Sequence, residues 1–452
     1  MKRRHNSLLT TLVILLSLAL LAGAAALLIL TIPQKAPQEV TALETSSVFT
    51  AEAEPTQPER EEAYEGALPP AAEIISEAGT QTQQPEAAAP QTPEEDQPNA
   101  EADAAAALAR QTLAAMTEDE KLWQLFYVTP ELLTGVETAT RAGESTKSAL
   151  ESMPVGGIIY FAKNLEDRAQ TIELLQNTQS YSKLPLFLGT DEEGGTVSRV
   201  GSNAALGAQT VGSMKSLGQA ADPAAVYEAG QTLSSSLSGL GFNMDFAPVA
   251  DVSSGASAVI DDRAFGRDAQ LCASLVSVMT DSLKAGGTVS CLKHFPGYGS
   301  AIVDDHYGTS ILTKTLAELE VCDFLPFASG MEAGAPFVMV SHLSVPEVTG
   351  DETPCDLSFK IVTEILRNKL AFDGVIITDS HQMASITDHY TSGEAAVKAL
   401  LAGCDMILMP QNLQEAFDAV KAALQDGTLT QARIDESVLR ILRVKAAYGI
   451  LK

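Results

Sequence analysis

The chain has 452 residues, of which 58 are Asp or Glu and 29 are Lys or Arg, so its formal net charge is −29. A surface this acidic repels nucleic acid and anionic lipid headgroups, which excludes a polyanion-binding protein and any nucleic-acid partner. The length suggests two or three domains, although one α/β barrel takes up about 250 residues or more.

The first predicted element is an apolar helix at the N-terminus. Leu8 to Ile32 is an almost unbroken apolar stretch that follows a basic cluster at positions 2–4. As a helix it would be about 37 Å long, enough to cross a bilayer core of about 30 Å. The basic flank favours a cytoplasmic N-terminus, with the rest of the chain outside the cell membrane. We therefore predict a single-pass membrane anchor over residues 1–32. A signal peptide cleaved near Ala22–Ala26, which would yield a secreted protein, is the alternative.

Residues 33–104 have the composition of a disordered linker. They are rich in Pro, Glu, Ala, Gln and Thr, and their 16 acidic residues are opposed only by Lys35 and Arg60. Such a segment buries too little apolar surface to offset the entropy lost on ordering. We predict an extended spacer that repels itself.

Regular secondary structure is predicted over residues 105–452. Thr117 and Glu120 have the spacing of a capping box that opens a helix. Short apolar segments, each predicted to be a strand, then follow at Leu125–Val128, Gly157–Phe161, Leu186–Thr190, Met244–Pro248, Ser290–Phe295, Phe337–His342, Val375–Asp379 and Met406–Pro410.

Amphipathic stretches of helical length separate most of these strands, including Ala169–Thr178, Ala224–Ser238, Ala269–Ala285 and Lys360–Leu370. Eight buried strands that alternate with helices over about 300 residues predict an α/β fold, a (β/α)8 TIM-like barrel. A doubly wound open sheet is the alternative, but the sequence lacks the Gly-rich phosphate fingerprint of that fold.

Titratable residues follow four of the predicted strands. Asp191 comes after the third strand, Lys293 and His294 end the fifth, His342 ends the sixth and Asp379 ends the seventh. Each has an ordinary structural interpretation, because an Asp at a strand end often caps the next helix. In an α/β barrel, however, the C-terminal ends of all strands meet at one rim, where the active site lies. The joint placement predicts an active site without a cofactor or metal.

The five cysteines give no sign of a metal site or a disulfide framework. An odd number cannot pair completely, and no CxxC or Cys/His ligand spacing is present. We predict free thiols, mostly buried as small apolar side chains. They lie at Cys272, Cys291, Cys322, Cys355 and Cys404.

Three longer motifs carry a resemblance to a known family. Asp191 to Arg199 reads DEEGGTVSR and is similar to D-x-E-G-G-x-V-x-R. Lys293 to Gly299 reads KHFPGYG and, with the DDH at 304–306, is similar to K-H-F-P-G-H-G-x4-D-x-H. Gly374 to Asp379 reads GVIITD and is similar to a nucleophile strand. Together with the shorter FAPVAD that ends at Asp251, these motifs resemble glycoside hydrolase family 3, in its single-domain β-N-acetylhexosaminidase branch. The resemblance covers nearly all of residues 105–452.

The resemblance implies a retaining, exo-acting β-N-acetylglucosaminidase that releases terminal β-linked N-acetylglucosamine. The expected export of the domain suggests peptidoglycan-derived or related oligosaccharides as substrates, with chitin fragments as the alternative. The resemblance also implies that Asp379 is the nucleophile and that His306, oriented by Asp304, is the acid/base. A histidine suits that role because its ordinary pKa of about 6.5 lies near working pH. The residues that would hold the sugar are Asp191, Arg199, Arg263, Lys293 and His294.

Two positions depart from the family pattern. Tyr298 stands where the family usually has His, and Ser380-His381 replace a more acidic or apolar pair after the nucleophile. We expect altered loop packing or leaving-group preference from these changes.

Two other functions stay open. Other family 3 β-glycosidases usually take their acid/base from a second α/β domain, whereas this sequence ends after a predicted helix near Ala432–Tyr448 and has the Asp304–His306 pair. A catalytically weak, wall-attached sugar-binding protein would keep the pocket without turnover. The sequence leaves the natural aglycone, phosphorolysis in place of hydrolysis, and the oligomeric state open.

Overall fold

The computed structural model describes residues 100–255, 259–301, 308 and 310–452. The chain divides at Pro90, and all of these residues belong to the second unit, Gln91–Lys452. The predicted anchor, residues 1–32, lies outside the described residues, as do Asp304 and His306. Within the described ranges no helix combines the length and the apolar character needed to cross a membrane.

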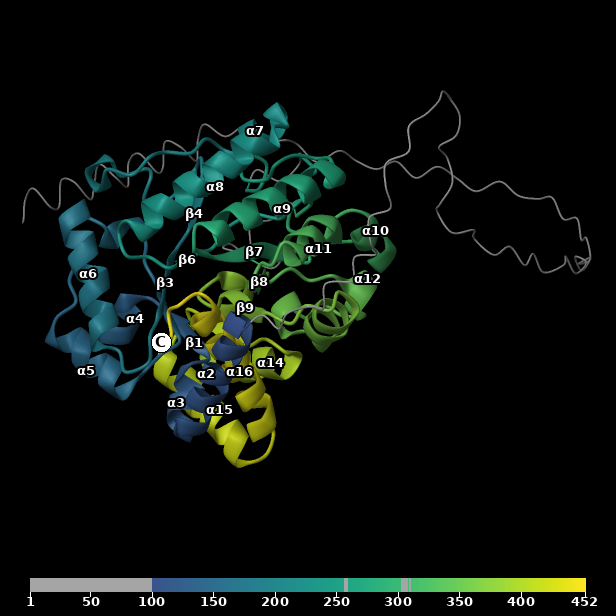
Figure 1. The fold of residues 1–452 in the computed structure, drawn as a ribbon. Coiled ribbons are helices and arrows are strands. Elements are labelled where there is room, and N and C mark those ends of the chain that lie inside the picture. Colours follow the sequence, from purple (N-terminus) through teal and green to yellow (C-terminus); the bar gives the residue numbers. More distant parts are fainter. Residues whose placement is uncertain (1–99, 256–258, 302–307, 309) are drawn as a thin grey trace, which may run out of the picture. The chain divides into compact units, whose positions relative to one another are not determined.

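Within the described residues, eight parallel strands form a closed barrel (Figure 1). They follow one another around the barrel in chain order, and β1 pairs with β10 to close it, with Phe126 opposite Ile407. This confirms every predicted strand and the (β/α)8 barrel, and it excludes the open sheet, which would leave two unpaired edges. The strands are β1 (Phe126–Val128), β2 (Gly157–Ile159), β3 (Phe187–Thr190), β6 (Met244–Asp245), β7 (Val289–Phe295), β8 (Phe337–Val340), β9 (Val375–Ser380) and β10 (Met406–Leu408).

Helices occupy the connections and cover the outside of the barrel. Those predicted from periodicity are confirmed as α6 (Arg168–Tyr181), α8 (Pro223–Ser238), α9 (Ala269–Ala285), η4 (Lys360–Lys369) and α16 (Gln431–Ala447). In Figure 1, α8, α9 and α11 lie side by side next to β6, β7 and β8. Other helices are α3 (Glu118–Trp123), α4 (Pro130–Thr134), α5 (Glu144–Ser152), α7 (Met214–Ala220), α10 (Leu316–Val321), α11 (Phe324–Glu332), α12 (Pro346–Thr349), α13 (Ala384–Thr387), α14 (Ser392–Ala402) and α15 (Leu413–Gln425). Shorter turns of helix lie at η1 (Ala162–Asn164), η2 (Ala204–Leu206) and η3 (Cys355–Leu357).

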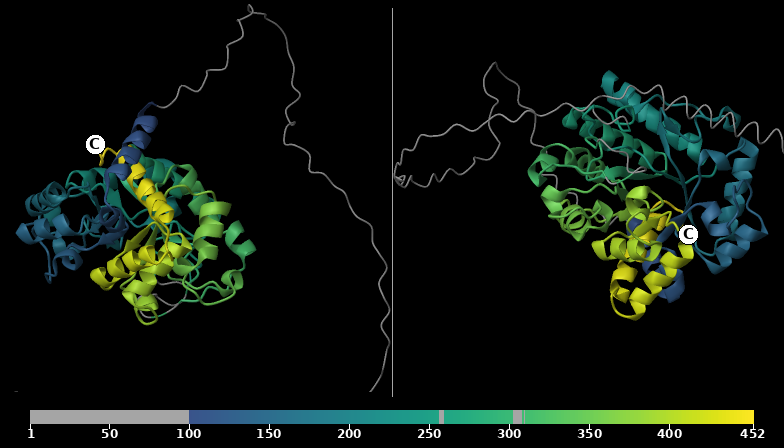
Figure 2. Two further views of the ribbon diagram at one scale, coloured as in Figure 1. Left: turned by 90° about the horizontal axis from the view of Figure 1, so that it is seen from below. Right: turned by 180° about the vertical axis from the view of Figure 1, so that it is seen from behind.

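The helix that precedes the first strand extends the domain toward the N-terminus. Helix α2 (Ala100–Ala115) packs along α16, and Figure 2 shows the two beside each other. Leu108, Ala109 and Leu113 of α2 belong to or pack against the core. Helix α2 therefore packs as part of the barrel domain.

The predicted capping box is present at the start of α3. The Glu120 backbone N–H donates to the Thr117 hydroxyl oxygen at 3.2 Å, and the Thr117 N–H donates to the Glu120 carboxylate at 2.9 Å. These bonds satisfy N–H groups that a helix start otherwise leaves without partners.

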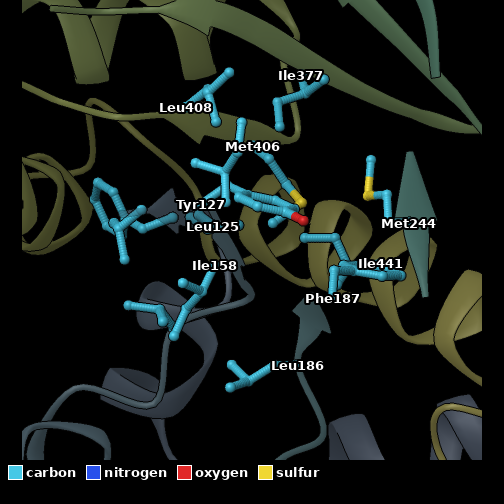
Figure 3. Packing of buried hydrophobic residues seen from close by; sticks show 14 of the residues in the cluster. Leu125, Tyr127, Ile158, Leu186, Phe187, Met244, Ile377, Met406, Leu408 and Ile441 are labelled. Carbon is cyan, nitrogen blue, oxygen red and sulfur yellow. The ribbon is translucent and has the colours of Figure 1, made fainter. Parts of the chain in front are cut away.

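The inside of the barrel is filled by large apolar side chains (Figure 3). Tyr127, Phe187, Met244, Ile377 and Met406 point inward from different strands and exclude water from the centre. The barrel is thus a packed core, and function is confined to its rim.

The cysteines match the prediction of free thiols. Cys272, Cys291, Cys355 and Cys404 are buried, Cys322 is half-buried, and the structure joins none of the five in a disulfide.

Candidate active site

A pocket of about 410 Å³ lies at the C-terminal ends of the barrel strands. It is lined by the predicted site residues Asp191, Arg199, Arg263, Lys293, His294 and Asp379. Apolar side chains complete the wall, among them Ile159, Phe161, Val197, Met339, Met383, Leu408 and Met409. The closed barrel therefore brings together groups that are up to 188 residues apart in the sequence.

Asp379 sits near the end of β9, with its carboxylate at the pocket wall. Its Oδ1 accepts a hydrogen bond of 2.7 Å from the backbone N–H of Ser380. Burial raises the pKa of Asp379, but nearby His294 and His342 outweigh this effect and hold the pKa below its ordinary value. The carboxylate is therefore ionised at neutral pH, the form that can attack a carbon atom.

Lys293 is the central cation of the site. Its Nζ donates to Asp191 Oδ1 at 2.8 Å and lies 2.6 Å from Glu193 Oε1. Burial lowers the pKa of Lys293, but Asp191 and Glu193 outweigh it and keep the pKa above its ordinary value. The ammonium group stays charged and fixes the position of Asp191 at the pocket wall.

Glu193 was not among the predicted site residues, although it lies in the first motif. Its carboxylate accepts hydrogen bonds of 2.8 Å from Nε and from Nη2 of Arg263. Burial raises the pKa of Glu193, but Lys293 and Arg263 outweigh it and bring the pKa to about 2. Glu193 is therefore a fixed anion that orients two cations of the pocket.

The tautomer of His294 follows from its two partners. Nε2 lies 3.3 Å from Nη2 of Arg263, and Nδ1 lies 2.8 Å from Oδ2 of Asp251. Because a guanidinium group can only donate, Nε2 accepts in its contact with Arg263, and Nδ1–H donates to Asp251. Most of the N–H donors of Arg263 are therefore directed at Glu193 and His294.

Asp251 also holds the turn that follows Lys293 and His294. Its Oδ1 accepts the backbone N–H of His294 at 3.3 Å and that of Tyr298 at 2.6 Å. The Tyr298 ring is buried, with its centre 5.9 Å from that of the His294 ring. The departure from the family pattern at Tyr298 is therefore accommodated inside the fold, beside a pocket residue.

Arg199 reaches the pocket from a short hairpin formed by β4 (Glu192–Gly194) and β5 (Val197–Ser198). The turn between them uses Gly194 and Gly195 at φ of 82° and 63°, a backbone conformation that favours glycine. The Glu192 carboxylate accepts the N–H groups of Val200 at 2.6 Å and Gly201 at 3.0 Å. Glu192 is thus occupied in holding the hairpin closed.

The guanidinium group of Arg199 is less tightly held. Nη2 lies 3.8 Å from Asp191 Oδ2, and the group lies 5.7 Å from the centre of the Phe161 ring. Its side chain is 33% exposed, so donors remain available toward the pocket.

A second cluster lies next to the pocket without lining it. His342, Asp356 and His381 are buried, and their ligand-type atoms lie within 4.8 Å of one another. Among the described residues this is the group whose composition suits a metal ion. The sequence drew attention to His342 at a strand end and to His381 as a departure, but it contained no signal for Asp356.

The chain is similar to proteins of one family along most of its length. Residues 117–444 match the family model described as the glycosyl hydrolase family 3 N terminal domain. A beta-hexosaminidase of Bordetella avium is 34% identical over 312 residues, which cover 68% of this chain and 85% of that protein. A protein of Cellulomonas fimi named beta-N-acetylglucosaminidase/beta-glucosidase is 31% identical over 351 residues, covering 75% of this chain.

A solved structure gives the same result for the fold. The family 3 beta-N-acetylglucosaminidase of Paenibacillus sp. has a TM-score of 0.70 and 32% identity, covering 74% of this chain and 63% of that one. Some relatives are longer, since the match spans 59% of the Cellulomonas fimi protein and 53% of a beta-hexosaminidase A of Pseudoalteromonas piscicida. The motifs at the rim, the closed barrel and the match over residues 117–444 agree, and the chain belongs to glycoside hydrolase family 3.

Proposed function

We propose that the chain is a glycoside hydrolase that acts as a retaining, exo-acting β-N-acetylglucosaminidase. The observation that carries this proposal is the Asp379 carboxylate, which is ionised and faces a pocket lined by Lys293 and Asp191. Retaining hydrolysis needs one carboxylate to attack the anomeric carbon and a second group to protonate the leaving oxygen. Asp379 meets the first requirement.

The pocket suits the terminal sugar of a chain. Its volume of about 410 Å³ lies within the range of about 300–1,000 Å³ found for small-molecule sites. Asp191 can accept hydrogen bonds from sugar hydroxyls, while Arg199 and Lys293 can donate to them. The apolar wall, which includes Met339 and Met409, offers contacts for the C–H face of the ring and for an acetyl methyl group.

The first chemical step forms a covalent intermediate. An oxygen of Asp379 attacks the anomeric carbon as the bond from that carbon to the leaving oxygen breaks. His306, oriented by Asp304, gives its proton to the leaving oxygen, so the aglycone departs as an alcohol. The products of this step are the glycosyl-enzyme ester at Asp379 and a neutral His306.

The second step releases the sugar. Water attacks the anomeric carbon of the ester, His306 takes a proton from that water, and the Asp379 carboxylate is regenerated. Two inversions at one carbon return the β configuration. His294 and Arg263 stay in place through both steps, because their partners Asp251 and Glu193 are buried.

The cellular setting belongs to the same proposal. The apolar stretch that ends at Ile32 would anchor the chain in the cell membrane, with the barrel on the extracytoplasmic side. Peptidoglycan fragments or wall-attached glycan ends that carry N-acetylglucosamine are the substrates available there, and relatives named beta-hexosaminidase support a substrate of this kind.

Kinetics with aryl glycosides test the proposal. We expect hydrolysis of nitrophenyl β-N-acetylglucosaminide to exceed that of the matching glucoside, with the β anomer as the first product by NMR. A slow fluorosugar substrate should label Asp379. A preference for the glucoside would favour another family 3 β-glycosidase, and no turnover on either would favour a sugar-binding protein. Varying inorganic phosphate separates hydrolysis from phosphorolysis, an activity that a structural relative titled beta-glucoside phosphorylase names.

A further inference from the structure

Two buried histidines share one carboxylate beside the strand that carries Asp379. His342 follows β8, Asp356 lies in η3 and His381 follows β9. His342 Nδ1 lies 3.1 Å from Asp356 Oδ1, and His381 Nε2 lies 2.9 Å from Asp356 Oδ2. The three side chains are 0–1% exposed, and none of them lines the pocket.

The protonation states of the two histidines follow from whether the partner of each ring nitrogen can donate or only accept a hydrogen bond. His342 Nε2 lies 2.9 Å from the carbonyl oxygen of Ser380, which only accepts, so Nε2 carries a proton. Nδ1 of the same ring lies 3.1 Å from Asp356 Oδ1, an ion-pair contact in which neither atom has a hydrogen-bond partner among the described residues. The negative charge of that carboxylate favours a second proton on the ring and an imidazolium ion. His381 faces the carboxylate through Nε2–H, while its Nδ1 has no partner among the described residues.

The pKa values agree with this arrangement. Burial lowers the pKa of His342, but Asp356 outweighs it and raises the pKa to about 9. Burial lowers the pKa of His381 below its ordinary value, and the cation on His342 adds to this effect. The group thus holds one charged and one neutral imidazole around the ionised Asp356, whose pKa is about 2 because the two histidines outweigh the effect of burial.

The cluster reaches the nucleophile through the backbone of one residue, Ser380. His342 donates to the Ser380 carbonyl, and the N–H of Ser380 donates to Asp379 Oδ1. The backbone N–H of His381 donates to the carbonyl of Leu408 on β10 at 3.0 Å. The segment that carries the nucleophile is therefore held from both neighbouring strands.

We propose that His342, Asp356 and His381 are positioning residues that hold the Asp379 carboxylate in place through the backbone of Ser380 and keep a positive charge beside it. This inference rests on the proposed function, in which Asp379 attacks the sugar.

A metal ion in the cluster is the competing interpretation. The cluster contains one hydrogen bond, between His381 Nε2 and Asp356 Oδ2, and one ion-pair contact, between His342 Nδ1 and Asp356 Oδ1. A histidine that binds a metal through one nitrogen usually donates from the other. For His381 as an Nε2 ligand, that donor would be a buried Nδ1–H without an acceptor in the described structure, and orphaned buried N–H groups are rare.

The pH dependence of the first step is the sharpest readout. The titratable groups that face His342 are Asp356, Asp379 and His381, while Cys404 and Tyr390 face Asp356. A dinitrophenyl N-acetylglucosaminide needs no acid to depart, so its kcat/KM does not depend on the protonation of His306. We expect the activity of the wild-type protein on this substrate to fall above about pH 9, as His342 loses its proton.

Asp356→Asn removes the counter-charge of His342, and a buried imidazolium without a partner has a lower pKa. We expect the alkaline fall in kcat/KM to move to lower pH by at least about one unit, and kcat at pH 7.5 to drop about 10- to 100-fold, the range seen when a supporting residue behind a reactive group is lost. KM should stay within about twofold of the wild-type value, because Asp356 does not touch the pocket.

A pair of milder variants keeps the test usable if Asp356→Asn folds poorly. His381→Gln retains an N–H donor toward Asp356, and His381→Leu does not. We expect kcat of the Gln variant to stay within about threefold of the wild-type value and kcat of the Leu variant to fall about tenfold, in line with the loss of one buried hydrogen bond.

Asp405→Asn is the matched control. Asp405 is a buried, ion-paired aspartate just before β10, and its Oδ2 lies 2.7 Å from Arg367 Nη2 rather than from either histidine of the cluster. Its loss should lower thermal stability without moving the alkaline fall. If Asp356→Asn behaves in the same way, the positioning role is wrong.

Three further outcomes would also overturn the inference. One zinc ion per purified chain, lost in His381→Leu, would make the cluster a metal site. A wild-type protein that turns over no aryl glycoside would remove the proposed function, and the positioning role with it. If the wild-type protein is active but the variants keep its alkaline fall in kcat/KM and its kcat, the positioning role alone is wrong.

Discussion

The Arg263 guanidinium group forms a bidentate ion pair with the Glu193 carboxylate, in which Nε and Nη2 each lie 2.8 Å from one oxygen. The two residues are 70 positions apart in the sequence. Lys293 Nζ lies 2.6 Å from the same carboxylate. The anion is almost fully buried, with 1% of its side chain exposed. One hidden carboxylate thereby sets the positions of two cations at the pocket wall.

Glu193→Gln should destabilise the fold and impair the pocket. The amide cannot neutralise Arg263 and Lys293, and removing one partner of a buried ion pair typically costs about 3–5 kcal/mol. Because the pKa of Glu193 is held at about 2, below its ordinary value, its stabilising effect is complete above about pH 4.5 and is lost as the pH falls toward 2. The difference in melting temperature between variant and wild type should therefore shrink below pH 4.5.

Glu192→Gln is the control for that experiment, because Glu192 is equally buried but accepts N–H groups of neutral residues. A Glu193→Gln protein with wild-type stability and KM at pH 7 would show that the buried anion is dispensable.

His306→Ala should separate good from poor leaving groups. If His306 protonates the leaving oxygen, its loss matters little for a dinitrophenyl glycoside and much for a natural disaccharide. We expect the activity on the disaccharide to fall by a factor about 10²–10⁴ larger than the activity on the dinitrophenyl glycoside, which is the usual contribution of general acid–base catalysis. Asp304→Asn should give a milder version of the same pattern. Equal losses on both substrates, in step with lower stability, would take His306 out of the mechanism.

The barrel should fold and act without the segment that precedes it. Removing residues 1–99 should leave the melting temperature and kcat unchanged, because residues 33–104 lack core-forming composition. Removing residues 1–115 should lower the melting temperature, since α2 covers α16 and contributes Ala109 to the core. If the variant that lacks residues 1–99 is inactive while the full-length protein in detergent is active, the domain begins before residue 100.

Lys445→Met should stabilise the protein at neutral and acidic pH. Lys445 is fully buried, with its Nζ 2.7 Å from Gln124 Oε1 and 5.0 Å from the centre of the Phe187 ring. Burial lowers its pKa from 10.5 to about 7. The folded state therefore binds fewer protons than the unfolded state between pH 7 and 10.5, so burying Lys445 costs most at and below pH 7.

We expect the variant to melt a few degrees higher at pH 6, with a smaller gain near pH 10, because one kcal/mol corresponds to about 2–4 °C in a large domain. Lys147→Met, at an exposed position of α5, is the control. A lower melting temperature for Lys445→Met at both pH values would show that the contacts with Gln124 and Phe187 outweigh the cost of burial.

The fold and the main polar groups of the rim could be predicted from the sequence because they depend on local patterns. Short apolar segments separated by amphipathic helices predicted each strand of the barrel, and the polar residues at the C-terminal ends of β3, β7 and β9 marked the pocket wall. Once parallel strands close into a barrel, residues that follow them meet at one end whatever their separation along the chain.

What each rim carboxylate does was decided only by the tertiary structure. Glu192 and Glu193 are neighbours with the same chemistry, yet one holds a hairpin a few residues away and the other binds Arg263 and Lys293. Asp356 lies in a short turn without any local signal, and it gains its role because closure of the barrel brings β8 and β9 beside it. The periodicity of the sequence specifies which face of an element is buried, but side-chain pairing depends on how distant elements pack, and that geometry exists only in the folded chain.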